Sequence, residues 1–177
     1  MNTPRCLVLL AALTLESCRY PGEFRNAPEA SAQAVVRGTK SPNGGAAFAT
    51  HIDGGPTSFW RLDDNFRLPA GTHTCRTAFS DRRETVSYAP MRFVAEAGKD
   101  YVLVRTRDPD VADAFTATQH PTTPDAWIVL DRRDRMRIRE SGSQDSGPVI
   151  AEASREDFVF GVSSAEGAIA RYRLLNP

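Results

Sequence analysis

Apolar and polar residues alternate along most of the chain from about residue 34, which is the pattern of half-buried β-strands. Glycine, proline and aspartate separate these segments, as in 53–56 (DGGP) and 69–71 (PAG), and they indicate turns. The segments predicted as strands are 46–53, with Phe48, Thr50 and Ile52 on one face; 57–62; 72–79, with His73, Cys75, Thr77 and Phe79 on one face; 88–95, with Met91, Phe93 and Ala95 together; 101–107; and 126–131. Many short strands with few helical windows predict an all-β fold, a small antiparallel β-sandwich.

The end of the chain is less clearly periodic. We expect the sandwich domain to span 34–177, with its core in 34–140, a longer connection at 108–125, and a break at 141–148. Residues 149–177 are predicted to add a closing hairpin, with strands at 157–162 and 168–175. Helical spacing of Ile169, Tyr172 and Leu175 leaves a helix open as the alternative for the last segment.

One apolar run lies near the start of the chain, at 7–15 (LVLLAALTL), and Arg5 precedes it. A helix of this length spans about 13 Å, whereas the hydrocarbon core of a bilayer is about 30 Å thick. The run therefore indicates a secretory signal peptide, residues 1–17, rather than a membrane-spanning helix.

Residues 15–18 (LESC) resemble the lipobox of bacterial lipoproteins, in which a branched apolar residue and a small residue precede the cysteine that receives the lipid. Glu16 stands where the lipobox usually has a small or apolar residue. The resemblance implies lipidation of Cys18, with 18–33 as a flexible tether, and Arg19 in place of aspartate favours the periplasmic face of the outer membrane. An ordinary cleaved signal with an incidental Cys18 is the alternative.

Charge and cysteine content narrow the possibilities further. The 22 basic and 22 acidic residues cancel, and binding to a nucleic-acid backbone depends on excess positive charge, so no nucleic-acid partner is expected. Cys6 leaves with the signal and Cys18 carries the lipid, so Cys75 has no partner for an intramolecular disulfide. We expect Cys75 to be a small buried hydrophobe beside Phe79.

The stretch Ile52-Asp53-Gly54, followed by Phe66-Arg67-Leu68-Pro69-Ala70-Gly71-Thr72-His73-Thr74, resembles the pattern of PEGA-type surface modules. The continuation 93–101 (FVAEAGKDY) and the later strand at Trp127 resemble segments of small bacterial lipoproteins. The likeness covers roughly 34–131 and implies a small antiparallel sandwich in the cell envelope, without catalysis and without a stated substrate. In this pattern His73 begins a strand beside a tight turn, and we expect it to bond to the turn backbone.

The chain offers little catalytic chemistry. His51, His73 and His120 lack the spacing of a zinc site, and 161–165 (GVSSA) falls short of a serine nucleophile elbow. We therefore expect no catalytic, metal or cofactor site, and no cofactor. His51 and Asp53 are interpreted as a solvated polar pair.

The best candidates for an interaction surface are charged and aromatic. Arg133, Arg135, Arg137 and Arg139 would line one face of a strand, with Met136 and Ile138 on the other. That stripe suits an acidic protein or anionic lipid headgroups, and a solvated edge strand is the alternative. Phe59 and Trp60 are the aromatic candidates.

Three functions stay open from the sequence. The first is a non-enzymatic envelope lipoprotein, held to the membrane by its N-terminal lipid, that binds another envelope protein or acts structurally. The second is an accessory lipoprotein of a secretion or transport assembly, and the third is a hydrolase with an unrecognised site.

Overall fold

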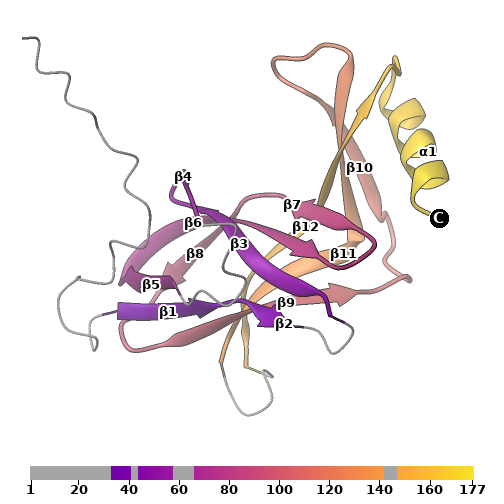
Figure 1. Ribbon diagram of the computed structural model, residues 1–177. Helices are drawn as coiled ribbons and strands as arrows, with labels where there is room; N and C mark the ends of the chain where they lie inside the picture. The colour runs from indigo at the N-terminus through magenta and orange to yellow at the C-terminus, as the bar shows by residue number, and fades with distance from the viewer. Residues whose placement is uncertain (1–32, 41–43, 58–65, 142–146) are drawn as a thin grey trace, which may run out of the picture.

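The computed structural model describes residues 33–40, 44–57, 66–141 and 147–177, and within them the chain forms β-strands followed by a C-terminal helix (Figure 1). The strands are β1 (Gln33–Arg37), β2 (Thr39–Lys40), β3 (Ala46–Ile52), β4 (Gly55–Pro56), β5 (Phe66–Pro69), β6 (Gly71–Ser80), β7 (Thr85–Tyr88), β8 (Met91–Ala95), β9 (Asp100–Arg107), β10 (Phe115–Gln119), β11 (Ala126–Glu140) and β12 (Val149–Phe160), and the helix is α1 (Ala165–Leu175).

These strands belong to one curled sheet with the order β2-β3-β6-β7-β12-β11-β9-β1-β5, to which β4, β8 and β10 pair at the sides. Strands β1 and β2 connect the two ends of this strand order. β1 pairs with β9 near one end, and β2, which follows Gly38, pairs with β3 near the other end. The Thr39 hydroxyl also donates to the Leu103 carbonyl on β9, at 2.5 Å. Because β3 and β9 stand near opposite ends of the strand order, the β1–β2 segment bends the sheet around an interior.

The mostly-β prediction is confirmed, but the finer prediction is not. β1 runs parallel to β9, so the sheet is mixed rather than purely antiparallel. All the described strands also share one curled sheet, and the two separate packed sheets of a sandwich are not confirmed.

The main core fills the inside of the curl. On β6 the predicted alternation is confirmed, because His73, Cys75, Thr77 and Phe79 are all buried while Thr72, Thr74 and Arg76 are exposed. Met91, Phe93 and Ala95 of β8 are also buried together, as expected. The residues of this core are Ala34, Val36, Ala47, Ala49, Ile52, Leu68, Cys75, Phe79, Val86, Tyr88, Met91, Phe93, Ala95, Tyr101, Leu103, Met136, Ile138 and Ala153.

The faces of β3 differ from the prediction. Ala49 pairs with Thr77 and His51 with the next residue of β6, Arg76, so Thr50 is an extra residue, a β-bulge. The bulge shifts the alternation by one, and Ala49 and Ile52 both join the core, whereas Phe48, Thr50 and Ile52 were expected on one face.

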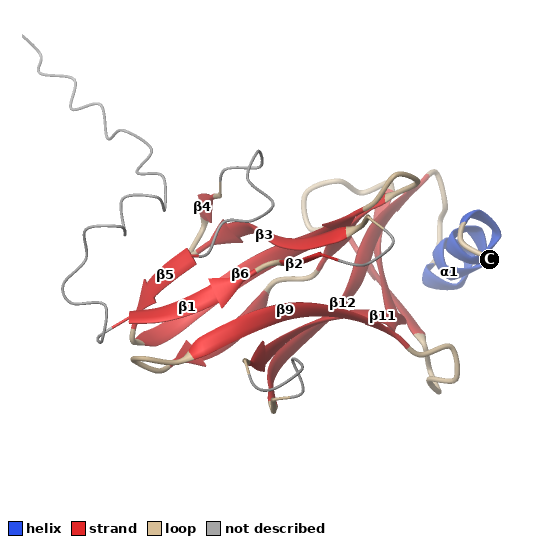
Figure 2. Ribbon diagram, turned by 60° about the horizontal axis from the view of Figure 1, so that its bottom comes forward, coloured by secondary structure: helices blue, strands red, loops and turns tan. Residues whose placement is uncertain are grey.

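β11 and β12 form a long hairpin that leaves the curled part of the sheet and projects from it (Figures 1 and 2). We call the projecting part the ribbon: it consists of β10, residues 126–131 of β11 and residues 155–160 of β12. β10 lies inside 108–125, which was predicted as a connection. Its mostly polar sequence, TATQ after Phe115, did not indicate a strand. The predicted strand at 126–131 is confirmed, and β10 and β12 pair on its two sides.

The predicted closing strand at 168–175 is wrong, and the alternative of a helix is confirmed, because these residues belong to α1. Gly161, at φ 68°, ends β12 in a backbone conformation that glycine adopts easily. Ser164 then caps the helix by accepting a hydrogen bond from the Gly167 N–H. Ala168 and Tyr172, one helical turn apart, are buried against Val129 and Val159 of the ribbon, and they form a second, smaller core.

Candidate functional site

Strand β11 bends where it passes from the curled part of the sheet into the ribbon. Asp131 pairs with Arg155 of β12, but the next pair joins Arg135 to Ser154, so three residues of β11 lie between two neighbouring positions of β12. This irregularity brings two carboxylates, those of Asp131 and Asp134, to the same bend, and both are buried. We call the bend and its charged neighbours the joint.

Asp134 is 5% exposed, and its hydrogen-bond partners come from two other strands. Arg105 of β9 holds it with two hydrogen bonds, from Nε at 2.9 Å and from Nη2 at 2.5 Å, and the Tyr88 hydroxyl donates at 2.8 Å. Burial and the nearby Asp134 raise the pKa of Tyr88 above its usual range, so the phenol remains a donor. The Arg105 guanidinium also lies 4.2 Å from the ring centre of Phe79 in the main core.

Asp131, 3% exposed, ties the helix to the ribbon. The Tyr172 hydroxyl of α1 donates to its Oδ2 at 3.1 Å. Arg133 contacts the same carboxylate through Nε, at 3.1 Å, and Nη2, at 3.0 Å, while its guanidinium lies 4.6 Å from the ring centre of Phe115. Burial raises the pKa of Tyr172 above its usual range, which again keeps a donor in place.

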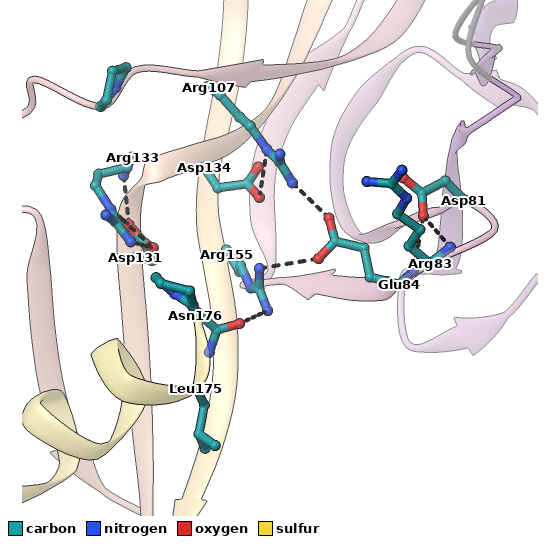
Figure 3. Close-up of a pocket in the computed structure, with 12 residues that line it drawn as sticks. Asp81, Arg83, Glu84, Arg107, Asp131, Arg133, Asp134, Arg155, Leu175 and Asn176 are labelled. Carbon is teal, nitrogen blue, oxygen red and sulfur yellow. Dashed lines mark hydrogen bonds and ion pairs between the residues drawn. The ribbon is translucent and has the colours of Figure 1, made fainter.

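An open cleft of about 700 Å³ lies beside the joint (Figure 3). Glu84 stands at its centre and contacts three arginines: Arg105 at 2.9 Å, Arg107 at 2.6 Å and Arg155 at 3.6 Å. Arg155 also bonds to Asp157 and to Asn176, which follows α1. The lining residues are Asp81, Arg83, Glu84, Arg107, Pro109, Asp131, Arg133, Asp134, Arg155, Leu175, Asn176 and Pro177.

The positive and negative side chains that line this cleft are equal in number. Its lining has four carboxylates and four guanidiniums, and Glu84, Asp131 and Asp134 are each held by arginine. The oxygens of these carboxylates already accept hydrogen bonds from arginine side chains. The arrangement suits a structural connection between the two cores better than proton transfer.

The predicted arginine stripe is divided by the joint. Arg135, Arg137 and Arg139 share the face opposite the buried Met136 and Ile138, as expected. Arg133 does not belong with them, because the bend turns it toward Asp131 and Phe115. The alternative of a solvated edge strand is also wrong, since β9 and β12 pair on both sides of this part of β11.

The three arginines that remain are only partly exposed. Arg135 and Arg137 share the carboxylate of Glu152, at 3.0 and 3.1 Å, and Arg139 donates to the Gly147 carbonyl at 3.2 Å. The other candidates, Cys18, Phe59 and Trp60, lie outside the described residues.

His73 bonds to the turn backbone, as predicted: its Nε2 donates to the Pro69 carbonyl at 2.9 Å. Its Nδ1 lies 2.7 Å from Oδ2 of Asp53, so Asp53 pairs with His73 rather than with His51. Partial burial opposes the charge of Asp53, but hydrogen bonds from the Thr74 N–H and from His73 lower its pKa overall.

Cys75, His73 and Asp53 lie close together, but their contacts are not those of a catalytic triad. Both ring nitrogens of His73 face oxygen atoms, and the Cys75 thiol is directed to the Arg76 carbonyl, at 3.7 Å. Burial, together with the charge of Asp53, raises the pKa of Cys75 to about 12, so the reactive thiolate is suppressed.

The ribbon has an apolar surface that the sequence analysis missed. Phe158 and Phe160 are 49% and 53% exposed on β12, and Val159 between them points to α1. The segment 157–162 (DFVFGV) is apolar on both faces, so alternation alone could not tell which side would be covered.

The described ranges contain no group of three or more histidine, cysteine, aspartate or glutamate side chains placed to hold a metal ion. No helix in this part of the chain is long and apolar enough to cross a membrane. In comparisons with known proteins, no family model, curated protein or solved structure matches the chain.

We predict that Asp134→Asn lowers the free energy of unfolding by about 3–5 kcal/mol, because it leaves the buried Arg105 without its main counter-charge. Urea unfolding followed by circular dichroism measures this. Asp125→Asn, at an exposed position, is the control and should change the free energy by less than about 0.5 kcal/mol. Equal effects of the two substitutions would contradict the structural importance of the joint.

We also predict that Cys75 resists labelling by a bulky maleimide in the native protein, because the thiol is buried and its pKa is about 12. The measurement uses the chain with Cys6→Ser and Cys18→Ser, followed by mass spectrometry. Labelling should go to completion in urea, which serves as the control. Fast labelling without denaturant would show that this part of β6 opens readily.

Proposed function

We propose that the protein is a non-catalytic binding module of the cell envelope, anchored by lipid at Cys18 on the periplasmic face of the outer membrane. The apolar run at 7–15, followed directly by LESC, supports the anchor. The resemblance of 52–74 to PEGA-type surface modules supports the same placement. Two or more acyl chains give stable attachment, so the folded region would work beside the membrane.

The observation that carries the binding role is the uncovered face of the ribbon. Phe158 pairs across the strands with Ile128, and His120 lies 5.7 Å from its ring, so the exposed aromatics belong to one apolar surface. α1 covers only the opposite face (Figure 1). Exposed aromatic clusters are the usual anchors of protein interfaces.

The partner that fits this face is another envelope protein with an apolar surface. An accessory lipoprotein of a secretion or transport assembly is the second candidate, and it differs only in what the ribbon binds. The hydrolase is the weakest candidate, because the carboxylates at the centre of the cleft are engaged by arginines.

A photocrosslinking experiment in cells tests the proposal. A benzoylphenylalanine replaces Phe158 in one strain and Val94 in another; Val94 is an isolated apolar residue, 58% exposed on β8. We expect a crosslinked envelope protein from position 158 and none from position 94. We also expect Cys18→Ser to move the protein out of the membrane fraction and to remove the crosslink.

Two outcomes would contradict the proposal. If both positions crosslink alike, the ribbon is not a specific binding surface. If Cys18→Ser leaves the protein in the membrane fraction, the lipid anchor at Cys18 is wrong, whatever the crosslinks show.

A further inference from the structure

The outer face of four neighbouring strands carries an excess of arginine. β11, β9, β1 and β5 are adjacent in the sheet, and Figure 2 shows β9, β1 and β5 side by side. On β1, β5 and β11, the side chains that point away from the main core alternate with buried ones, whereas Tyr101, Val102 and Leu103 of β9 are all buried. We call their arginines the basic face: Arg37 on β1, Arg67 on β5, and Arg135, Arg137 and Arg139 on β11.

The strand register places these arginines together. Arg67 pairs across the strands with Val35, two residues before Arg37 on the same strand. Arg37 pairs with Val102 of β9, and Val102 pairs in turn with Arg139. Arg137 and Arg135 follow at steps of two residues along β11. Val102 itself is buried, so the arginines of β1 and β5 lie on one side of it and those of β11 on the other.

Acidic residues only partly neutralise the basic face. Arg37 pairs with Asp100 at 2.6 Å, and Arg135 and Arg137 share Glu152. Five arginines against two carboxylates leave a net charge of +3, on a chain whose overall formal charge is zero. Arg37 and Arg67 are exposed to solvent, and the only hydrogen bond that Arg139 donates within the described residues goes to the neutral carbonyl of Gly147.

The tether proposed for residues 18–33 ends at Gln33, the first residue of β1, which is one of the four strands of this face. Fourteen residues, 19–32, separate Cys18 from Gln33, where β1 begins. The flexible tether proposed from the sequence would span about 20 Å over that length. Arg67 and Arg37 lie about 7 and 13 Å further along the sheet, from the rise per strand residue. A lipid at Cys18 would thus hold the basic face within reach of the headgroups.

We propose that the basic face docks on an anionic phospholipid surface and sets the orientation of the folded region on its own membrane. This inference rests on the proposed anchor for its geometry. Guanidinium groups bind phosphate oxygens in a bidentate manner. Each basic side chain near an anionic bilayer strengthens binding roughly fivefold. An acidic protein would need no proximity to the tether, and for that reason we favour the lipid surface.

Vesicle binding tests this inference directly. Full-length chain with Cys18→Ser is sedimented with phosphatidylcholine vesicles that contain or lack phosphatidylglycerol. Every variant keeps the same leader, so differences between variants report the folded region. We expect the chain to prefer the anionic vesicles and to lose that preference in high salt, because headgroup contacts are screened.

Three variants refine the test. Arg67→Gln with Arg137→Gln should weaken binding to anionic vesicles by roughly 25-fold, from fivefold per arginine. The matched control, Arg82→Gln with Arg92→Gln, removes two exposed arginines elsewhere and should change binding less than about twofold. Glu152→Gln removes an acid from the basic face and should tighten binding about fivefold.

The inference is overturned if the control weakens binding as much as the test variant, or if Glu152→Gln, with an unchanged melting temperature, has no effect. It is also overturned if the parent protein binds vesicles with and without phosphatidylglycerol equally well. These results are independent of the anchor, because Cys18 is serine throughout. A failed fractionation experiment would reject the anchor and leave the vesicle result standing.

Discussion

The buried charge of Asp134 constrains the rest of the structure. A carboxylate removed from water is stable only when cations and donors of matching geometry surround it. Arg105 on β9 and Tyr88 on β7 supply these groups, so the bend in β11 is fixed against two other strands. Asp131 meets the same requirement three residues earlier through Arg133 and Tyr172, and this fixes α1 on the ribbon.

The joint separates two kinds of surface. On one side lies the curled sheet, with its large core inside and the basic face outside. On the other lies the ribbon, whose small core under α1 leaves Phe158 and Phe160 uncovered. A fixed joint would let one face rest on the membrane while the ribbon is offered to a partner, which is the combination that the proposed function needs.

The alternation of apolar and polar residues, together with turn residues, predicted the strands and turns that depend on neighbouring residues alone. The alternation of β6 was sufficient to place His73, Cys75 and Phe79 inside, and Pro69 and Gly71 indicated the turn that His73 binds. The polar strand β10 was missed because its partners Val129 and Leu130 supply the apolar contacts. The helix at 165–175 had a signal in its helical spacing, but the choice between helix and strand depended on packing against the ribbon. The bulge at Thr50 depended on strand pairing that a single sequence does not display.

The joint itself had no sequence signal. Arg105 and Asp134 are 29 residues apart, and Tyr88 and Asp134 are 46 apart, so nothing in the neighbourhood of each residue indicates the other. Arg133 looked like one member of a regular stripe, but the three-residue irregularity in β11 redirected it. Long-range pairing of charges is decided by the fold, and the interpretation of the stripe was therefore only partly right.

We expect the joint to hold the ribbon in one orientation. A distance measurement by pulsed electron spin resonance tests this orientation directly, with spin labels at Thr72→Cys on β6 and Thr118→Cys on β10, in a chain where Cys6 and Cys18 are serine. Both positions are exposed, and Cys75 is buried away from the label. A fixed joint gives one narrow distance distribution between the two labels. A broad distribution, or two separate populations, in the folded parent protein would contradict it.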